Sequence, residues 1–303
     1  MTTQPEAIAG VADVDCSETR ALVTGSTSGI GRAAALALGR LGADVIVHGR
    51  DQEAGAAVVN ELDALGSDGQ FVRADFADPD AVRELAATVR RTTDGLDLLI
   101  NNAGGFFRSG RLTDLGVEYT FHVNHLSPYL LTAELLDHLT AGSRIVTTAS
   151  AAHQGTSLDL SRVQTLDEYS GMWAYSHSKL ANILFSSELA RRLDAADRDV
   201  VSNSIHPGAI PGSGFSRFLP GPIPRVLEAL DGLPIVTSVA EGAAEILVPA
   251  LSPRTATISG RYFSDQRPTQ PSAPAQGTYA AQRLWNASAD LLGIATPLAE
   301  GAE

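Results

Sequence analysis

Short apolar runs alternate with amphipathic segments along most of this chain, and this alternation constrains its fold more than any other feature. The segments expected to be strands lie at 21–23, 45–47, 71–72, 96–100, 144–148 and 200–205, and most of them are short apolar runs. Helical periodicity covers 30–41, 52–65, 79–92, 115–139, 172–193 and 279–292. Buried strands that alternate with helices predict a parallel sheet covered on both faces. Right-handed crossovers make such a sheet doubly wound, and its ligands bind at the carboxyl ends of the strands. The predicted class is therefore α/β.

Length and composition fit one globular domain with a sizeable core. The chain has 303 residues, of which 44% are hydrophobic and 19% are charged. We expect a single domain over 19–295, preceded by a flexible extension over 1–18. The proline- and glycine-rich stretch at 206–234 is too long for a plain connection between elements, and we expect it to form a substrate lid.

Charge and cysteine content exclude several classes of function. The net charge of −13, without a cluster of arginines, argues against nucleic-acid binding. Cys16 is the sole cysteine, so an internal disulfide and a thiolate metal cluster are excluded, and a reducing, cytoplasmic location is favoured. The seven histidines show no metal-ligand spacing, so no metal is expected. No apolar run approaches the roughly 20 residues of a membrane helix, so no membrane partner is expected.

A glycine-rich segment connects the first expected strand to the first expected helix. Residues 25–31 read Gly-Ser-Thr-Ser-Gly-Ile-Gly. Glycines at these positions allow a tight turn and a close approach of the backbone to a pyrophosphate at the positive helix N-terminus. The spacing G-x-x-x-G-x-G differs from the generic dinucleotide pattern G-x-G-x-x-G. The position still favours a dinucleotide site over a glycine-rich turn that binds nothing.

The only lysine of the chain, Lys179, stands four residues after Tyr175. On a helix, residues at i and i+4 share one face, so the ammonium can lie beneath the phenol oxygen. A nearby positive charge favours the phenolate and lowers the pKa of the tyrosine from about 10. The pair could then exchange a proton near neutral pH. The alternative is an ordinary solvated Tyr–Lys pair on a surface.

An ordered series of short motifs resembles the short-chain dehydrogenase/reductase family, whose members share a Rossmann fold. The motifs are Thr24–Gly31, Asn101-Asn102-Ala103-Gly104, Asn124, Ser150, Tyr175–Lys179 and His206-Pro207-Gly208. The segments at 123–126, 175–182 and 284–286 are similar to the retinol dehydrogenase-like and carbonyl reductase branch. The resemblance runs from about residue 20 to residue 292.

The resemblance implies a role for each catalytic residue. Tyr175 would act as general acid/base, and Lys179 would lower its pKa and bind the nicotinamide ribose. Ser150 would donate a hydrogen bond to the substrate oxygen, and Asn124 would hold a water linked to Lys179. Pro128, inside the expected helix at 115–139, predicts a bend or restart that could shift Asn124.

The resemblance also implies a set of cofactor contacts and an oligomer. Asp75 would accept from the adenine amino group, although many such Asp residues cap helices. Residues 102–104 would line the adenine-ribose side, and residues 207, 208 and 210 would pack near the nicotinamide. The full set is Gly25, Ser26, Thr27, Ser28, Gly29, Ile30, Gly31, Arg50, Asp75, Phe76, Asn102, Ala103, Gly104, Tyr175, Lys179, Pro207, Gly208 and Ile210. A homodimer or homotetramer, mediated by helices, is expected.

The end of the second strand predicts the choice of cofactor. An acidic residue there would bind the ribose 2′-hydroxyl and repel a 2′-phosphate. This position holds Gly49, followed by Arg50, whose guanidinium suits a phosphate. The sequence therefore favours NADP(H) over NAD(H). Ser28, before Gly29, supplies no second basic group, so the preference could be incomplete.

The expected reaction is hydride transfer between NADP(H) and an aldehyde, ketone or alcohol. Apolar side chains near the motifs favour a small lipophilic substrate: Phe106, Phe107, Trp173, Phe215 and Phe218. Two alternatives stay open. A cofactor-binding regulatory protein without turnover would lack part of the Tyr-Lys-Ser set, and the motifs do not separate carbonyl reduction from reduction of a carbon–carbon double bond.

Overall fold

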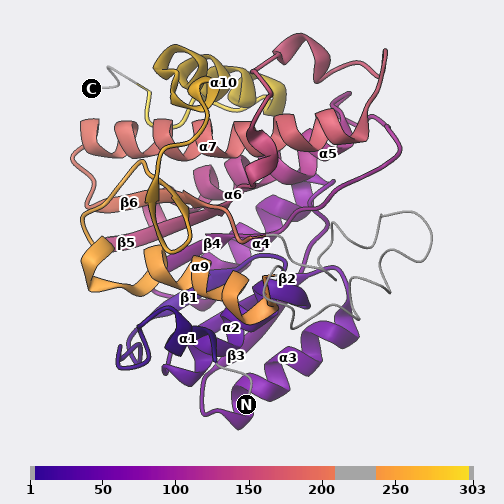
Figure 1. The fold of residues 1–303 in the computed structure, drawn as a ribbon. Coiled ribbons are helices and arrows are strands. Elements are labelled where there is room, and N and C mark those ends of the chain that lie inside the picture. The colour runs from indigo at the N-terminus through magenta and orange to yellow at the C-terminus, as the bar shows by residue number, and fades with distance from the viewer. Residues whose placement is uncertain (1–3, 209–236, 300–303) are drawn as a thin grey trace.

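The computed structural model describes residues 4–208 and 237–299, which form an eight-stranded sheet covered by helices on both faces (Figure 1). The strands follow the order β3-β2-β1-β4-β5-β6-β7-β8. All neighbouring pairs are parallel except β7 and β8. The strands are β1 (Arg20–Val23), β2 (Asp44–Gly49), β3 (Gly69–Arg73), β4 (Leu96–Asn101), β5 (Leu139–Thr148), β6 (Val200–Ile205), β7 (Tyr262–Ser264) and β8 (Arg267–Thr269). The predicted doubly wound α/β sheet is confirmed, with β7 and β8 added at one edge.

The helices divide between the two faces of the sheet. One face carries α1 (Pro5–Ile8), α2 (Gly29–Arg40), α3 (Gln52–Ala64) and α9 (Val239–Leu251). The other carries α4 (Pro79–Thr92), α6 (Ser127–Leu135) and α7 (Gly171–Ala195), with α10 (Thr278–Leu292) packed outside α7. None of the described helices combines the length and the apolar content needed to cross a lipid bilayer.

Successive residues of a strand lie in two different hydrophobic cores, one on each face of the sheet. In β1, Leu22 belongs to the core beneath α4, α6 and α7, whereas Ala21 and Val23 belong to the core beneath α2 and α9. In β4, Leu99 belongs to the first core and Ile100 to the second. Side chains alternate between the faces of a strand, so a strand covered on both sides is mostly apolar on both faces. This is why short apolar runs mark β1 and β2 in the sequence.

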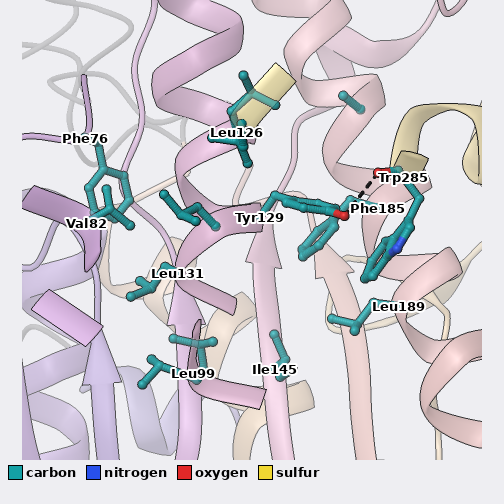
Figure 2. Packing of buried hydrophobic residues seen from close by; sticks show 14 of the residues in the cluster. Phe76, Val82, Leu99, Leu126, Tyr129, Leu131, Ile145, Phe185, Leu189 and Trp285 are labelled. Carbon is teal, nitrogen blue, oxygen red and sulfur yellow. Dashed lines mark hydrogen bonds between the residues drawn. The ribbon is translucent and has the colours of Figure 1, made fainter. Parts of the chain in front are cut away.

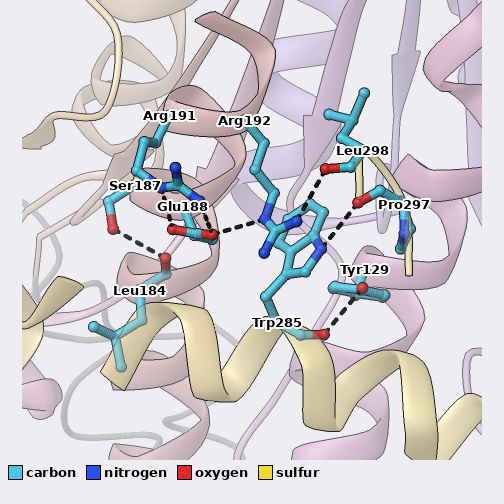
Figure 3. A network of polar contacts seen from close by, with 9 residues as sticks. All are labelled: Tyr129, Leu184, Ser187, Glu188, Arg191, Arg192, Trp285, Pro297 and Leu298. Carbon is cyan, nitrogen blue, oxygen red and sulfur yellow. Dashed lines mark hydrogen bonds and ion pairs between the residues drawn. The ribbon is translucent and has the colours of Figure 1, made fainter. Parts of the chain in front are cut away.

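The outer helix α10 is held by a cluster of aromatic rings over α6 and α7 (Figure 2). The rings of Phe185 and Trp285 stack with centroids 5.8 Å apart, and the Tyr129 hydroxyl donates to the Trp285 carbonyl at 3.1 Å. Beside them, Arg192 donates to Glu188 at 2.7 Å and to the Leu298 carbonyl at 2.9 Å (Figure 3). Because α7 touches the sheet below and α10 above, it is buried over most of its circumference.

The N-terminal residues differ from the expected flexible extension. Residues 4–18 pack against α2 and α9, with Val11 and Cys16 each 1% exposed. Glu6 accepts two hydrogen bonds from the Arg40 guanidinium, at 2.6 and 2.9 Å. The segment is ordered in part because Glu6 forms a bidentate ion pair with a residue far along the chain.

The expected helix at 115–139 is broken into unlike pieces. The structure has α5 (Tyr119–Phe121), one π-helical turn, η1 (His122–Leu126), and then α6. Pro128 lies in the first turn of α6, where a proline is tolerated, so the predicted restart is confirmed. The π turn supplies the register change, and Asn124 lies within it.

Candidate active site

The glycine-rich segment forms a turn at the carboxyl end of β1 and starts α2. Gly25 and Gly29 have φ of +65° and +59°, which side chains rarely adopt. A Cβ at Gly31 would lie 2.4 Å from the Gly25 carbonyl oxygen, so only glycine fits. Nothing lies within 4 Å of a Cβ placed at Gly29, and Ser28 makes no side-chain capping bond at the helix start. The first turn of α2 can therefore accept a phosphate group.

Thr24 joins this turn to the end of β4. Its hydroxyl donates to the Ile100 carbonyl and accepts from the backbone N–H groups of Asn102 and Ala103, both at 2.9 Å. The Asn102 amide donates to the Thr24 carbonyl at 2.8 Å. Strands β1 and β4 are neighbours whose crossovers leave in opposite directions, so this is the switch point where doubly wound sheets bind ligands.

Helix α7 brings Tyr175 and Lys179 to the end of β5, where Ser150 follows. The Lys179 ammonium lies 5.7 Å from the centroid of the Tyr175 ring and donates to the Thr148 carbonyl at 2.9 Å. The Tyr175 and Ser150 side chains are hydrogen-bonded, and the Ser150 hydroxyl also accepts from the Ala152 N–H at 3.2 Å. The three predicted catalytic residues are therefore close together.

The expected low pKa of Tyr175 is not what the structure shows. Burial raises the pKa of the phenol above its ordinary value, and only the Ser150 hydrogen bond opposes this effect. Burial also lowers the pKa of the Lys179 ammonium to about 8. The expectation was wrong because it counted the attraction of the ammonium and omitted desolvation, and the ammonium is directed at a backbone carbonyl.

Asn124 is fixed by protein groups on three sides. Its side-chain oxygen accepts from the Gly105 N–H at 2.9 Å, and its amide donates to the Gly105 carbonyl and to the Ser178 hydroxyl. A Cβ at Gly104 would lie 2.8 Å from this oxygen and 3.7 Å from Nζ of Lys179. Asn124 thus lies beside the lysine, and its predicted water-holding role stays a prediction.

Two arginines flank the end of β2. The guanidinium of Arg50 is exposed and lies 3.9 Å from the Asp75 carboxylate. Arg73, paired with Gly49 in the parallel register, donates from Nε to the Arg50 carbonyl at 3.0 Å. Sequence reasoning missed Arg73 because the register of β2 and β3 places it there. A Cβ at Gly49 would lie 2.5 Å from the Thr27 methyl group, so an acidic residue is sterically excluded unless Thr27 moves.

The aromatic residues predicted to surround the substrate separate into different roles. Phe106 contacts the Tyr175 ring edge-on, with centroids 5.9 Å apart. Phe107 packs on Tyr119, and Trp173 stacks on His177 with centroids 4.6 Å apart. Phe106 therefore lies against the ring of Tyr175.

The remaining predicted residues lie near the carboxyl ends of the strands or outside the residues that the structure describes. Asp75 accepts from the Ala77 N–H in the turn before α4, whereas the residue that caps α4 is Asp78, so the alternative role of Asp75 as a helix cap is wrong. Phe76 is buried at 3% exposure. Gly208 has φ of +87°. Ile210, Phe215, Phe218 and most of the expected lid at 206–234 lie outside the described residues.

Comparisons with known proteins agree with this arrangement. Residues 19–217 match the family model for short chain dehydrogenases. Retinol dehydrogenase 14 of Mus musculus is 37% identical over 288 residues, which cover 90% of this chain and 85% of that protein. Polyprenol dehydrogenase of Mus musculus is 36% identical over 281 residues, which cover 90% of this chain and 83% of that protein. A short-chain dehydrogenase from Burkholderia cenocepacia J2315, solved in complex with NADP, aligns with a TM-score of 0.66 and 31% identity, covering 81% of this chain and 95% of that one.

These matches extend over both the glycine-rich turn and the tyrosine-lysine pair. The likeness to retinol dehydrogenases agrees with the branch predicted from the sequence motifs. The chain belongs to the short-chain dehydrogenase/reductase family of oxidoreductases, which act on alcohol and carbonyl groups.

Proposed function

We propose that this protein is an NADP(H)-dependent oxidoreductase that interconverts a lipophilic aldehyde or ketone and its alcohol. The observation that carries the proposal is the hydrogen-bonded pair of Tyr175 and Ser150 beside Lys179, at the same sheet edge as the glycine-rich turn. A reduced nicotinamide would supply the hydride to the carbonyl carbon.

The chain supplies the proton and stabilises the developing charge. The Tyr175 hydroxyl would donate its proton to the forming alkoxide, and Ser150 would donate a hydrogen bond to the same oxygen. The raised pKa of Tyr175 keeps the phenol protonated near neutral pH, which is the form that reduction requires. Lys179, buried at 4% exposure, would favour the phenolate left after proton transfer.

The residues at the dinucleotide end fit NADP(H). Residues 25–31 would hold the pyrophosphate, and Asn102, Ala103 and Gly104 would line the adenine-ribose side. The exposed guanidiniums of Arg50 and Arg73 lie where the ribose 2′-phosphate is expected, and Gly49 carries no carboxylate at the end of β2. The NADP complex of the Burkholderia relative supports this choice.

Substrate class and assembly are parts of the same proposal. Phe106 at the Tyr175 ring gives the reacting carbonyl an apolar neighbour. Two relatives are named for retinol and for polyprenol, which are lipophilic alcohols. A homodimer or homotetramer remains the proposed assembly.

The reaction is tested by NADPH consumption with a panel of lipophilic aldehydes and ketones. Tyr175→Phe and Lys179→Arg are each expected to lose most of the turnover while they still bind NADPH. The matched control is Tyr279→Phe, which changes a tyrosine on α10 that is 73% exposed and should keep full activity. Full turnover in Tyr175→Phe would eliminate the mechanism.

The cofactor preference is tested separately with Arg50→Ala. We expect its Kd for NADPH to rise about tenfold, the value of one charge-assisted contact, with little change in the Kd for NADH. An equal rise for both dinucleotides would contradict a phosphate-binding role for Arg50.

A further inference from the structure

A buried histidine connects the glycine-rich turn to the loop after β3. His48 lies in β2 at 3% exposure, with Nδ1 at 3.2 Å from the Gly25 nitrogen and Nε2 at 3.2 Å from the Ala74 carbonyl oxygen. The Gly25 N–H can only donate and the Ala74 carbonyl can only accept. The ring must therefore be neutral, with its proton on Nε2.

The backbone of His48 contacts the same turn a second time. Its carbonyl accepts from the Ser26 N–H at 2.9 Å, and its N–H donates to the Ser26 hydroxyl at 3.1 Å. The imidazole also stacks on Phe76, with centroids 4.5 Å apart and planes at 25°. One residue thus contacts Gly25, Ser26, Ala74 and Phe76, which come from both sides of the expected adenosine site.

The geometry points to His48 as a positioning residue for the dinucleotide, which fixes the spacing between the glycine-rich turn and the Asp75–Phe76 loop. This inference rests on the proposed function, because it concerns the cofactor that the turn would hold. The Gly25 backbone is also packed closely against the end of β4, since a Cβ there would meet Cα of Ala103 at 2.8 Å. Burial lowers the pKa of His48 to about 4, so the ring stays neutral under ordinary conditions, with Asp75 and Arg50 the charged groups acting on it.

Three variants separate the two side-chain bonds of His48. His48→Phe keeps a ring to stack on Phe76 but removes both bonds. His48→Asn places an amide oxygen near the position of Nδ1, so it can still accept from Gly25 but cannot reach Ala74. His48→Gln places its amide further out and should lose the Gly25 bond. The matched control is His125→Phe, which changes another buried histidine whose Nε2 lies 2.9 Å from the Ser288 hydroxyl of α10.

The readouts are the Kd for NADPH by fluorescence titration, kcat at saturating NADPH, and the melting temperature of the free protein. We expect the Kd for NADPH to rise about tenfold in His48→Phe, because roughly one net hydrogen bond is lost. His48→Asn should restore part of the affinity, and His48→Gln should not. The kcat at saturation should stay within about twofold in His48→Phe, and the control should melt earlier with an unchanged Kd.

Nitrogen-15 NMR of the free protein tests the inference without the cofactor, and should show the Nε2–H tautomer of His48 near neutral pH. A protonated ring, the Nδ1–H tautomer, or variants that melt early but keep the native Kd would each overturn the positioning role and leave the proposed function standing. If the unaltered protein binds neither NADPH nor NADH, the proposed function and this inference fall together.

Discussion

Four buried histidines make the stability of this protein sensitive to acid. Burial lowers the pKa to about 4 in His48, His122 and His177. It lowers the pKa of His125 to about 3. In the unfolded chain a histidine has a pKa of about 6.5. The unfolded state therefore binds more protons than the folded state between these values, so stability is full above pH 6.5 and is lost as the pH falls toward 4.

The size of the effect follows from the pKa differences. Between pH 8 and pH 5, each histidine lowers the free energy of unfolding by about 2 kcal/mol, and the four lower it by about 8 kcal/mol together. Glu245 acts in the opposite direction, because burial raises the pKa of its carboxyl to about 7. Protonation of Glu245 in the folded state adds back about 2–3 kcal/mol of stability at pH 5. The net loss of about 5–6 kcal/mol is comparable to the whole stability of a typical domain, about 5–15 kcal/mol.

The variant His125→Phe isolates one of these contributions. His125 is surrounded by the rings of Phe121, Tyr129 and Phe185, so a phenyl ring is accommodated. Ser288 keeps its hydrogen bond to the Leu284 carbonyl at 2.8 Å. The free energy of unfolding would be measured by urea titration with circular dichroism at pH 8 and at pH 5. The loss between the two pH values should be smaller by about 2 kcal/mol than in the unaltered protein.

A partly exposed histidine provides the control for this measurement. His138 contacts the Thr93 hydroxyl at 2.8 Å and has only a modest lowering of its pKa by burial. His138→Gln should leave the pH dependence nearly unchanged. If His125→Phe shows the same loss of stability between pH 8 and pH 5 as the unaltered protein, burial does not keep His125 neutral and the reasoning is wrong.

Three further substitutions test the packing and the site. Gly104→Ala should lower kcat at least about tenfold, because its Cβ would lie 2.8 Å from the side-chain oxygen of Asn124; an unchanged kcat would contradict the requirement for glycine there. Trp285→Ala should reduce the free energy of unfolding by about 3–5 kcal/mol in urea titrations, because it removes the ring that joins α10 to α7, and a loss under about 1 kcal/mol would show that α10 is not so held. Gly49→Asp should weaken the binding of both NADPH and NADH in titrations because its Cβ would meet Thr27 at 2.5 Å, whereas a simple change of preference to NADH would show that Thr27 moves freely.

Much of the fold could be predicted because its signals are local. The mostly apolar segment at 96–100 indicated a buried strand, and Leu99 and Ile100 do lie in opposite cores. The glycine-rich turn was predicted in place because its glycines are required by backbone geometry. The extension at 1–18 could not be predicted, because the partner of Glu6, Arg40, lies 34 positions away.

The sequence named the candidate catalytic residues but not the pKa values of their side chains. Tyr175, Lys179 and Ser150 meet as expected, since helix spacing and strand order bring them together. The direction of the Tyr175 pKa was wrong because burial is a property of the packed site. His48 was missed because a lone histidine in a strand carries no local signal, and its role depends on two backbone groups from other segments.

The sequence alone determined the class of fold, the place of the glycine-rich turn and the candidate catalytic pair Tyr175 and Lys179, because periodicity, glycine positions and i, i+4 spacing act over a few residues. Tertiary structure decided which groups are desolvated and which backbone atoms meet them. It placed the Lys179 ammonium on the Thr148 carbonyl, Arg73 beside Arg50, and His48 between Gly25 and Ala74. These contacts depend on strand register and on layer packing, which join segments far apart in the chain.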